Sequence, residues 1–91
     1  MENAMTIHLN ENKFMTPADV HAYLKFILGF PEYYGGNLAA LSDCLGDVNT
    51  PVKIVVIRSS KPKANYWFDK ICNVLQRGAD QNPNIEVEIQ R

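Results

Sequence analysis

The chain has 91 residues, of which 46% are hydrophobic and 21% are charged, and its formal net charge is −1. This length and composition are typical of one globular domain, so we expect a single domain over residues 1–91. They exclude a disordered tail and a strongly basic nucleic-acid binder. The longest aliphatic run is Ile54–Ile57, far short of the roughly 20 residues of a membrane span, so we expect no membrane segment.

The first half of the chain predicts a strand followed by a helix. Residues 6–9 alternate polar and apolar side chains, which indicates a half-buried strand, and residues 10–13 are expected to form a turn. Apolar residues then recur at helical spacing over residues 17–28. The signals that begin and end this helix are Thr16, Pro17 and Asp19 at its start and Gly29 and Pro31 at its end.

A loop with two tyrosines and two glycines leads into a shorter helix, predicted over residues 37–45. Asn37 is a favourable N-cap, and Gly46 is expected to end the helix. At about 100° per residue, the leucines share one face and Asp43 lies on the opposite face. The sequence therefore predicts a helix with an apolar inner side and an outer side that carries small residues and one carboxylate.

The second half predicts a strand, a helix and a last strand. Residues 52–57 are almost continuously β-branched, as in a strand buried on both faces, and residues 85–89 alternate strictly. An apolar stripe over residues 63–77 predicts a helix that ends before Gly78. The order strand, helix, helix, strand, helix, strand favours a two-layer α/β fold, with a three-stranded parallel sheet and helices packed on it.

The two cysteines, Cys44 and Cys72, are too few for the disulfide framework of a small secreted domain. The first residues also lack the basic and apolar regions of a secretory signal. We therefore expect a cytoplasmic protein with reduced thiols, in which each cysteine packs as a small hydrophobic side chain.

Charge is unevenly distributed along the chain. Residues 26–52 contain three acidic residues and no Lys or Arg, whereas residues 53–77 contain six basic residues and one acid. A nucleic-acid site on the basic stretch is one hypothesis, but it requires the basic side chains to share a continuous face, and Trp67 fits the apolar stripe better. We expect no nucleic-acid partner. The residues of this hypothetical patch are Arg58, Lys61, Lys63, Tyr66, Trp67, Lys70 and Arg77.

Catalytic signals are weak. The sequence has no Cys/His metal spacing, no phosphate-binding loop and no dinucleotide-binding glycine motif. Asp43 and Cys44 are adjacent on a helix and point about 100° apart, which does not favour a catalytic pair. We therefore expect neither an enzyme nor a bound cofactor or metal.

The most specific signal is the segment from Pro31 to Leu45, with the sequence PEYYGGNLAALSDCL. It resembles the barstar family, the intracellular inhibitors of barnase-type secreted ribonucleases. The resemblance rests on the run from Pro31 to Leu38, followed by Ala40-Leu41 and Asp43-Cys44-Leu45. The order of strands and helices also agrees over most of the chain. It implies a barstar-like fold for the whole chain.

The resemblance also implies a function, which is inhibition of a small basic ribonuclease of the extracellular type in a 1:1 complex. The loop and helix over residues 31–45 would occlude the active site, and Asp43 would occupy the place of a substrate phosphate, because a nuclease cleft is cationic. Such a protein is expected to be a monomer when it is not bound, as an immunity-type protein. The expected contact residues are Tyr33, Gly35, Asn37, Leu38, Ala39, Ser42, Asp43 and Asp47.

Several positions depart from the family pattern. Ala39, Asn49 and Arg77 stand where well-studied members carry acids, and Ser42 and Asp47 stand where they carry tryptophans. Asp43 is then the one acid kept from the cluster, with Asp47 as a possible substitute. These departures leave a second hypothesis open, in which the chain is a binding module of the same fold whose partner is not a ribonuclease.

Overall fold

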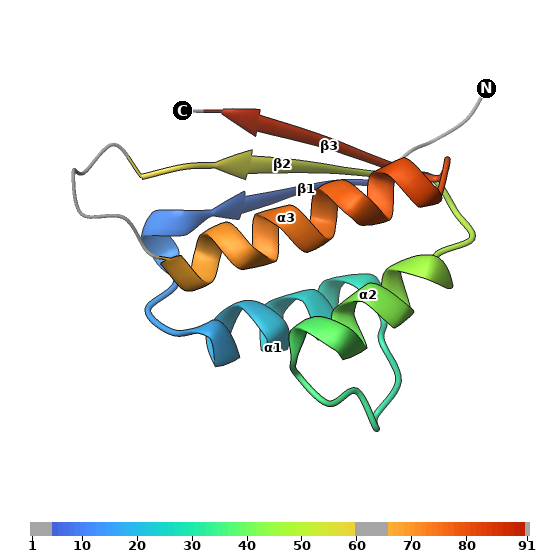
Figure 1. Cartoon of the computed structure of the whole chain (residues 1–91), viewed down its shortest axis with the longest axis horizontal. Coiled ribbons are helices and arrows are strands. Elements are labelled where there is room, and N and C mark those ends of the chain that lie inside the picture. Colours follow the sequence, from blue (N-terminus) through green and yellow to red (C-terminus); the bar gives the residue numbers. More distant parts are fainter. Residues whose placement is uncertain (1–4, 60–65, 91) are drawn as a thin grey trace.

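The structure is a computed structural model that describes residues 5–59 and 66–90. Within these ranges the chain forms a parallel sheet of three strands in the order β1-β2-β3, with three α-helices on one face (Figure 1). The predicted two-layer α/β fold is confirmed. The elements are β1 (Met5–Asn10), a 3-10 helix η1 (Glu11–Lys13), α1 (Pro17–Leu28), α2 (Leu38–Gly46), β2 (Val52–Ile57), α3 (Tyr66–Gln81) and β3 (Ile85–Gln90).

The central strand β2 is buried on both faces, as its composition predicts. Ile54 is in register with Ile7 of β1 and Val87 of β3, and it faces the helices. Val55 lies on the opposite face and is still only 7% exposed. The outer strands β1 and β3 each have one solvent-exposed face, because every second residue along them is exposed.

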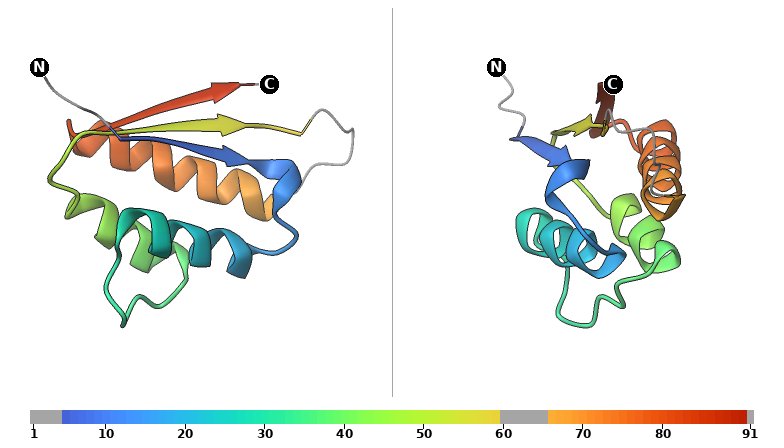
Figure 2. Two further views of the ribbon diagram at one scale, coloured as in Figure 1. Left: turned by 180° about the vertical axis from the view of Figure 1, so that it is seen from behind. Right: turned by 90° about the vertical axis from the view of Figure 1, so that its left-hand side faces the viewer.

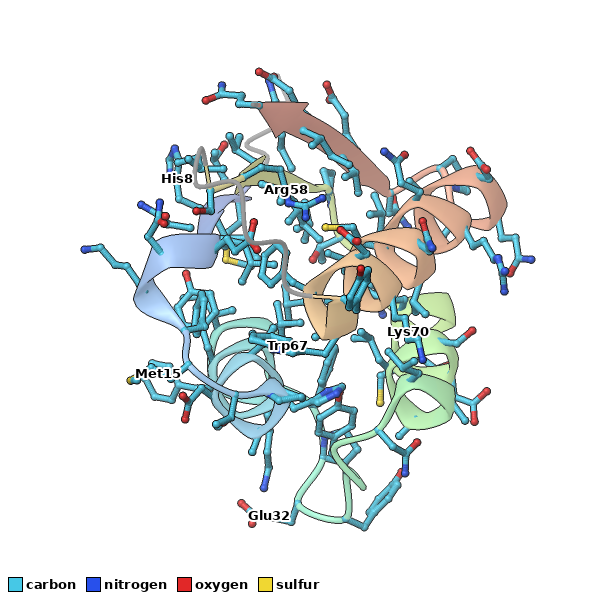
Figure 3. All side chains as sticks on the ribbon, turned by 60° about the vertical axis from the view of Figure 1, so that its left-hand side comes forward. His8, Met15, Glu32, Arg58, Trp67 and Lys70 are labelled. Atoms are coloured by element: carbon cyan, nitrogen blue, oxygen red, sulfur yellow. The ribbon has the colours of Figure 1, made fainter. Side chains whose placement is uncertain are left out.

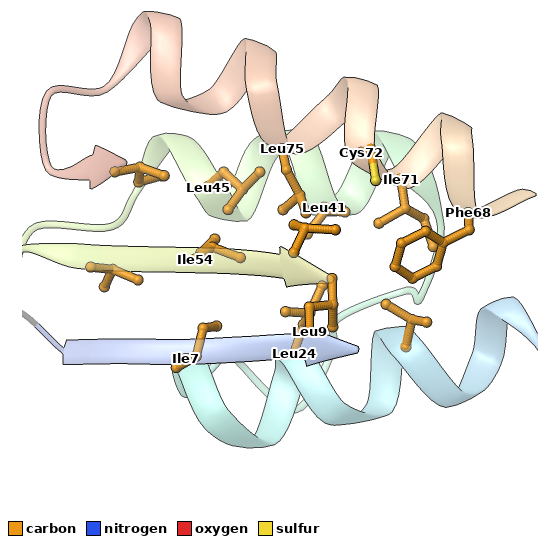
Figure 4. Packing of buried hydrophobic residues seen from close by; sticks show 14 of the residues in the cluster. Ile7, Leu9, Leu24, Leu41, Leu45, Ile54, Phe68, Ile71, Cys72 and Leu75 are labelled. Carbon is orange, nitrogen blue, oxygen red and sulfur yellow. The ribbon is translucent and has the colours of Figure 1, made fainter. Parts of the chain in front are cut away.

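The hydrophobic core lies between the sheet and the helices (Figure 4). Each helix contributes side chains that are almost completely removed from water, and each such side chain stabilises the fold by about 1.5–3 kcal/mol. These helical core residues are Val20 and Leu24 from α1, Leu41 and Leu45 from α2, and Phe68, Ile71 and Leu75 from α3.

The first helix has the predicted bounds and caps. The Thr16 hydroxyl accepts a hydrogen bond from the Asp19 amide, and the Asp19 carboxylate accepts one from the Thr16 amide. Gly29 ends the helix in the left-handed conformation, with φ at 70°. Residues 10–13, predicted as a turn, form a short 3-10 helix whose N-cap is Asn10.

Gly46 ends α2 as predicted and is its last residue, one position beyond the predicted range of 37–45. The prediction that Gly78 ends α3 is wrong, because this helix continues to Gln81. The reason for Gly78 is tertiary, because a Cβ atom there would lie 2.8 Å from Cδ1 and 3.2 Å from Cβ of Leu45. Glycine at this position lets α3 approach α2 closely. The predicted start of the same helix lies within residues 60–65, outside the described part of the chain.

Candidate partner-binding surface

One tyrosine of the loop between α1 and α2 anchors it to the body of the protein. The Tyr34 ring packs against Phe30, with ring centroids 4.9 Å apart, and its hydroxyl lies 2.5 Å from Nδ1 of His21 on α1. Burial raises the pKa of Tyr34 to about 12, so its hydroxyl keeps its proton. Burial also lowers the pKa of His21, which favours a neutral ring that accepts this proton in a hydrogen bond.

The neighbouring tyrosine has the opposite orientation. Tyr33 is 88% exposed, while Tyr34 is partly buried. The loop projects from the helical layer on the side away from the sheet, as both views in Figure 2 show. Anchoring by Tyr34 therefore presents Tyr33 to solvent on a segment that is fixed at its base.

The short helix α2 is held in place at both ends and along its inner side. The Asn37 side chain accepts a hydrogen bond of 2.8 Å from the Ala40 amide and caps the N-terminus. Leu41 and Leu45 are fully buried in the core. At the other end, the buried Asn82 amide donates to the carbonyl of Leu45 at 2.9 Å and to that of Val48 at 2.8 Å. The outer side of α2 thus sits on a rigid support.

The predicted contact residues form one exposed surface along the loop and the outer side of α2. Two of them also help to hold the helix in place, since Asn37 caps it and Leu38 packs against the core. That this surface contacts a partner stays a prediction. Its exposed members are Tyr33, Gly35, Asn37, Ala39, Ser42, Asp43 and Asp47, and Leu38 is half-buried.

Asp43 is exposed and points away from the core, as the helical spacing predicts. Among the residues that the structure describes, no Lys, Arg or His side chain lies within ion-pair distance of it. Asp43 is in the last turn of α2, and Asp47 is the C-cap residue. Because the helix dipole is also negative at this end, the two acids and the dipole place negative potential at the C-terminal end of α2.

The cysteine beside these acids is not activated. Burial raises the pKa of the Cys44 thiol, and the charges of Asp47 and Asp43 raise it further. A thiol with a raised pKa is a weaker nucleophile near neutral pH, because less of it is present as thiolate. Cys72 is buried in the core, as expected of a small hydrophobic side chain, and Cys44 is partly buried against it.

The described bases of the basic stretch do not share one face. Arg58 lies within the protein, where its Nε donates to Glu11 at 2.8 Å and its Nη2 to Asp69 at 2.5 Å. The hydrogen bond with Glu11 is the main cause of the raised pKa of Arg58. Lys53 lies on the open face of the sheet, paired with Glu88 at 3.2 Å. Of the other bases, Lys61 and Lys63 lie outside the described residues.

The positions that depart from the family pattern lie on two parts of the surface. Asn49 is exposed on the segment between α2 and β2. Ala39 and Arg77 line one groove between α2 and α3, together with Lys70. The sequence did not place Lys70 at this surface, because only the packing of α3 against α2 brings it there.

The described residues contain no cluster of His, Cys, Asp or Glu side chains that could hold a metal ion. In the same part of the chain, none of the helices combines the length and apolar character of a membrane-crossing segment.

Comparisons with known proteins agree with the resemblance noted in the sequence. The sequence profile of the family described as "Barstar (barnase inhibitor)" matches residues 4–90. A protein of Bacillus subtilis (strain 168) with the name "Putative ribonuclease inhibitor YrdF" is 37% identical over 65 residues, which cover 68% of this chain and 71% of that protein.

Proposed function

Because the chain belongs to the barstar family of barnase inhibitors, we propose that it inhibits a small basic ribonuclease by occluding its active site. In this proposal the chain acts as one barstar-like domain, in a 1:1 complex and in the cytoplasm of the cell that makes it. It binds the enzyme and catalyses no reaction itself.

The observation that carries the proposal is the position of Asp43. Its carboxylate is exposed on a capped, well-supported helix, at the negative end of the helix dipole, and it has no ion-pair partner among the described residues. A nuclease cleft binds phosphates and is therefore cationic. A carboxylate in such a cleft accepts the hydrogen bonds that the substrate phosphate would accept, and it offers no bond that the enzyme can cleave.

Occlusion follows from the shape of the surface. The loop before α2 projects beyond the helices (Figure 2), and its residue Tyr33 is 88% exposed. An exposed aromatic side chain beside a rigid helix is a typical anchor of protein interfaces. In the complex, the loop and α2 over residues 31–45 would fill the cleft while Asp43 meets its cationic groups. Binding and substrate access are then mutually exclusive.

The test is inhibition of RNA cleavage by purified barnase and by other small basic ribonucleases. We expect the wild-type protein to inhibit at least one of them stoichiometrically, with weaker binding as salt rises. Replacement of Asp43 by Ala should weaken inhibition by about a hundredfold or more, because cationic groups of the enzyme lose their partner in a desolvated interface.

The matched control is Glu86→Gln, which removes one negative charge from the open face of the sheet. It should change affinity by less than about threefold, since an exposed charge outside the contact acts only through long-range attraction. Equal affinities of Asp43→Ala and wild type would remove Asp43 from the proposed role. If no ribonuclease is inhibited, the second hypothesis remains, a barstar-fold binding module with another partner, which the cations beside α2 favour.

A further inference from the structure

A groove of about 330 Å³ runs between α2 and α3, next to the outer side of α2. The α2 side of the groove carries no charge and is made of small or apolar side chains. The α3 side carries two basic side chains with an amide and a valine between them. The lining residues are Leu38, Ala39 and Ser42 from α2 and Lys70, Asn73, Val74 and Arg77 from α3.

The two cations of the groove, like Lys13, form no ion pair within the described part of the chain. Lys70 and Arg77 are exposed and lie seven residues apart, on one side of α3. In the described ranges, neither has a carboxylate within ion-pair distance, whereas Lys25, Lys53 and Arg58 all do. Figure 3 shows Lys70 on α3 beside α2. The groove therefore presents two positive charges that the protein itself does not neutralise.

The shape of the groove suits a short acidic side chain. Ala39 and Ser42 are small, which leaves the space between the helices open, and Leu38 and Val74 provide apolar contacts. The amide of Asn73 and the cations on either side of it can donate hydrogen bonds to a carboxylate that enters. The methylene groups of an Asp or Glu side chain would meet the apolar part and its carboxylate the polar part.

Resting on the function proposed above, we propose that this groove binds an acidic side chain of the partner ribonuclease. The contact surface then has two halves of opposite sign. Asp43 meets cationic groups of the cleft, and the groove meets a carboxylate at its rim. A surface of alternating sign selects among basic nucleases, because an enzyme with a cation at the rim would be repelled by Lys70 and Arg77.

RNA fits the groove less well than a protein carboxylate does. A nucleic-acid backbone needs a continuous row of cations, and here Asp43 and Asp47 lie on the helix that forms the other side of the groove. The remaining described bases do not extend the row, since Lys53 and Arg58 are paired elsewhere.

The test is whether replacing a groove cation by Glu strengthens or weakens binding to the nuclease. Long-range attraction to a basic nuclease predicts that Arg77→Glu binds more tightly than wild type, because the inhibitor becomes more acidic. A carboxylate of the partner in the groove predicts the reverse, a loss of about tenfold or more for Arg77→Glu and for Lys70→Glu. The matched control is Lys13→Glu, an equal charge change on exposed η1, and it should bind as well as wild type or better.

Dissociation constants of wild type, Arg77→Glu, Lys70→Glu, Lys13→Glu and Asp43→Ala would be measured with the ribonuclease that the wild-type protein inhibits. The groove proposal is supported if Arg77→Glu weakens binding to the nuclease and Lys13→Glu does not. It is also supported if the affinity of Arg77→Glu is restored when one acidic residue at the rim of the nuclease is changed to Lys. If Asp43→Ala loses affinity while both groove variants match Lys13→Glu, the groove proposal fails and the proposed function stands. Absence of inhibition refutes both proposals. Binding of a short RNA at low salt that Arg77→Glu abolishes refutes the groove proposal, because RNA and not a protein carboxylate would then occupy the groove.

Discussion

The contact between Gly78 of α3 and Leu45 of α2 fixes the distance between the two helices that carry the candidate surface. An added Cβ at position 78 would lie 2.8 Å from Cδ1 and 3.2 Å from Cβ of Leu45. Leu45 is fully buried, so its side chain has no open space into which it could turn. The Gly78→Ala substitution must therefore push α2 and α3 apart.

The magnitude follows from two opposing effects. Overpacking of a core costs about 1–3 kcal/mol, while Ala in a helix interior gains about 1 kcal/mol over Gly. We expect a net loss of about 1 kcal/mol in the free energy of unfolding, which corresponds to a decrease of about 4–8 °C in the melting temperature of a domain of this size. Gly46→Ala is the matched control. A Cβ at that position has no atom within 4 Å, so this variant should be stabilised by about 0.5 kcal/mol.

The measurement is urea unfolding of both variants, monitored by circular dichroism. Gly78→Ala should also lose most of its destabilising effect in a Leu45→Ala background, because Cδ1 of Leu45, the atom at 2.8 Å, is then removed and only its Cβ at 3.2 Å remains. If Gly78→Ala is as stable as Gly46→Ala, the close approach of the helices is not what requires glycine, and the reasoning is refuted.

Two further predictions concern buried polar groups. Arg58→Met should lower the free energy of unfolding, measured in urea titrations, by about 3 kcal/mol. The reason is that it removes the charge that neutralises Glu11, which is only 2% exposed. A loss below about 1 kcal/mol would contradict this reasoning. Burial lowers the pKa of His21, so the unfolded chain takes up a proton near pH 6.5 that the folded protein resists. The contribution of His21 to stability should be complete above that pH and should be lost as the pH falls below it. His21→Gln should flatten this dependence in unfolding titrations, and equal slopes for both proteins would rule out His21 as its source.

Local signals in the sequence were sufficient to predict most of the elements. The capping box at Thr16 and Asp19, the glycine at position 29 and the asparagine at position 37 act within one turn of their helices, so their effects can be read from neighbouring residues. The alternation of apolar residues in the strands reports which face is buried in the same local way. These features gave the fold class and the outward position of Asp43.

Features that depend on distant parts of the chain could not be predicted. Gly78 has the sequence signature of a helix end, and its actual role depends on Leu45. Arg58 belongs to a basic stretch, but its partner Glu11 lies on η1 at the start of the chain. The two loop tyrosines are equivalent in the sequence, and contact with His21 selects the second of them as the anchor.

The acids at the C-terminal end of α2 are electrostatically unfavourable for that helix. An uncompensated acid in the last turn of a helix costs about 0.3–1 kcal/mol, and α2 has no basic residue there to offset it. The burial of Leu41 and Leu45 stabilises the helix by several times that amount, so the helix forms although the acids do not stabilise it. A cationic partner would remove this repulsion in addition to making its own contacts. The packing that stabilises α2 thus allows its outer side to carry charges suited to binding and unfavourable for folding.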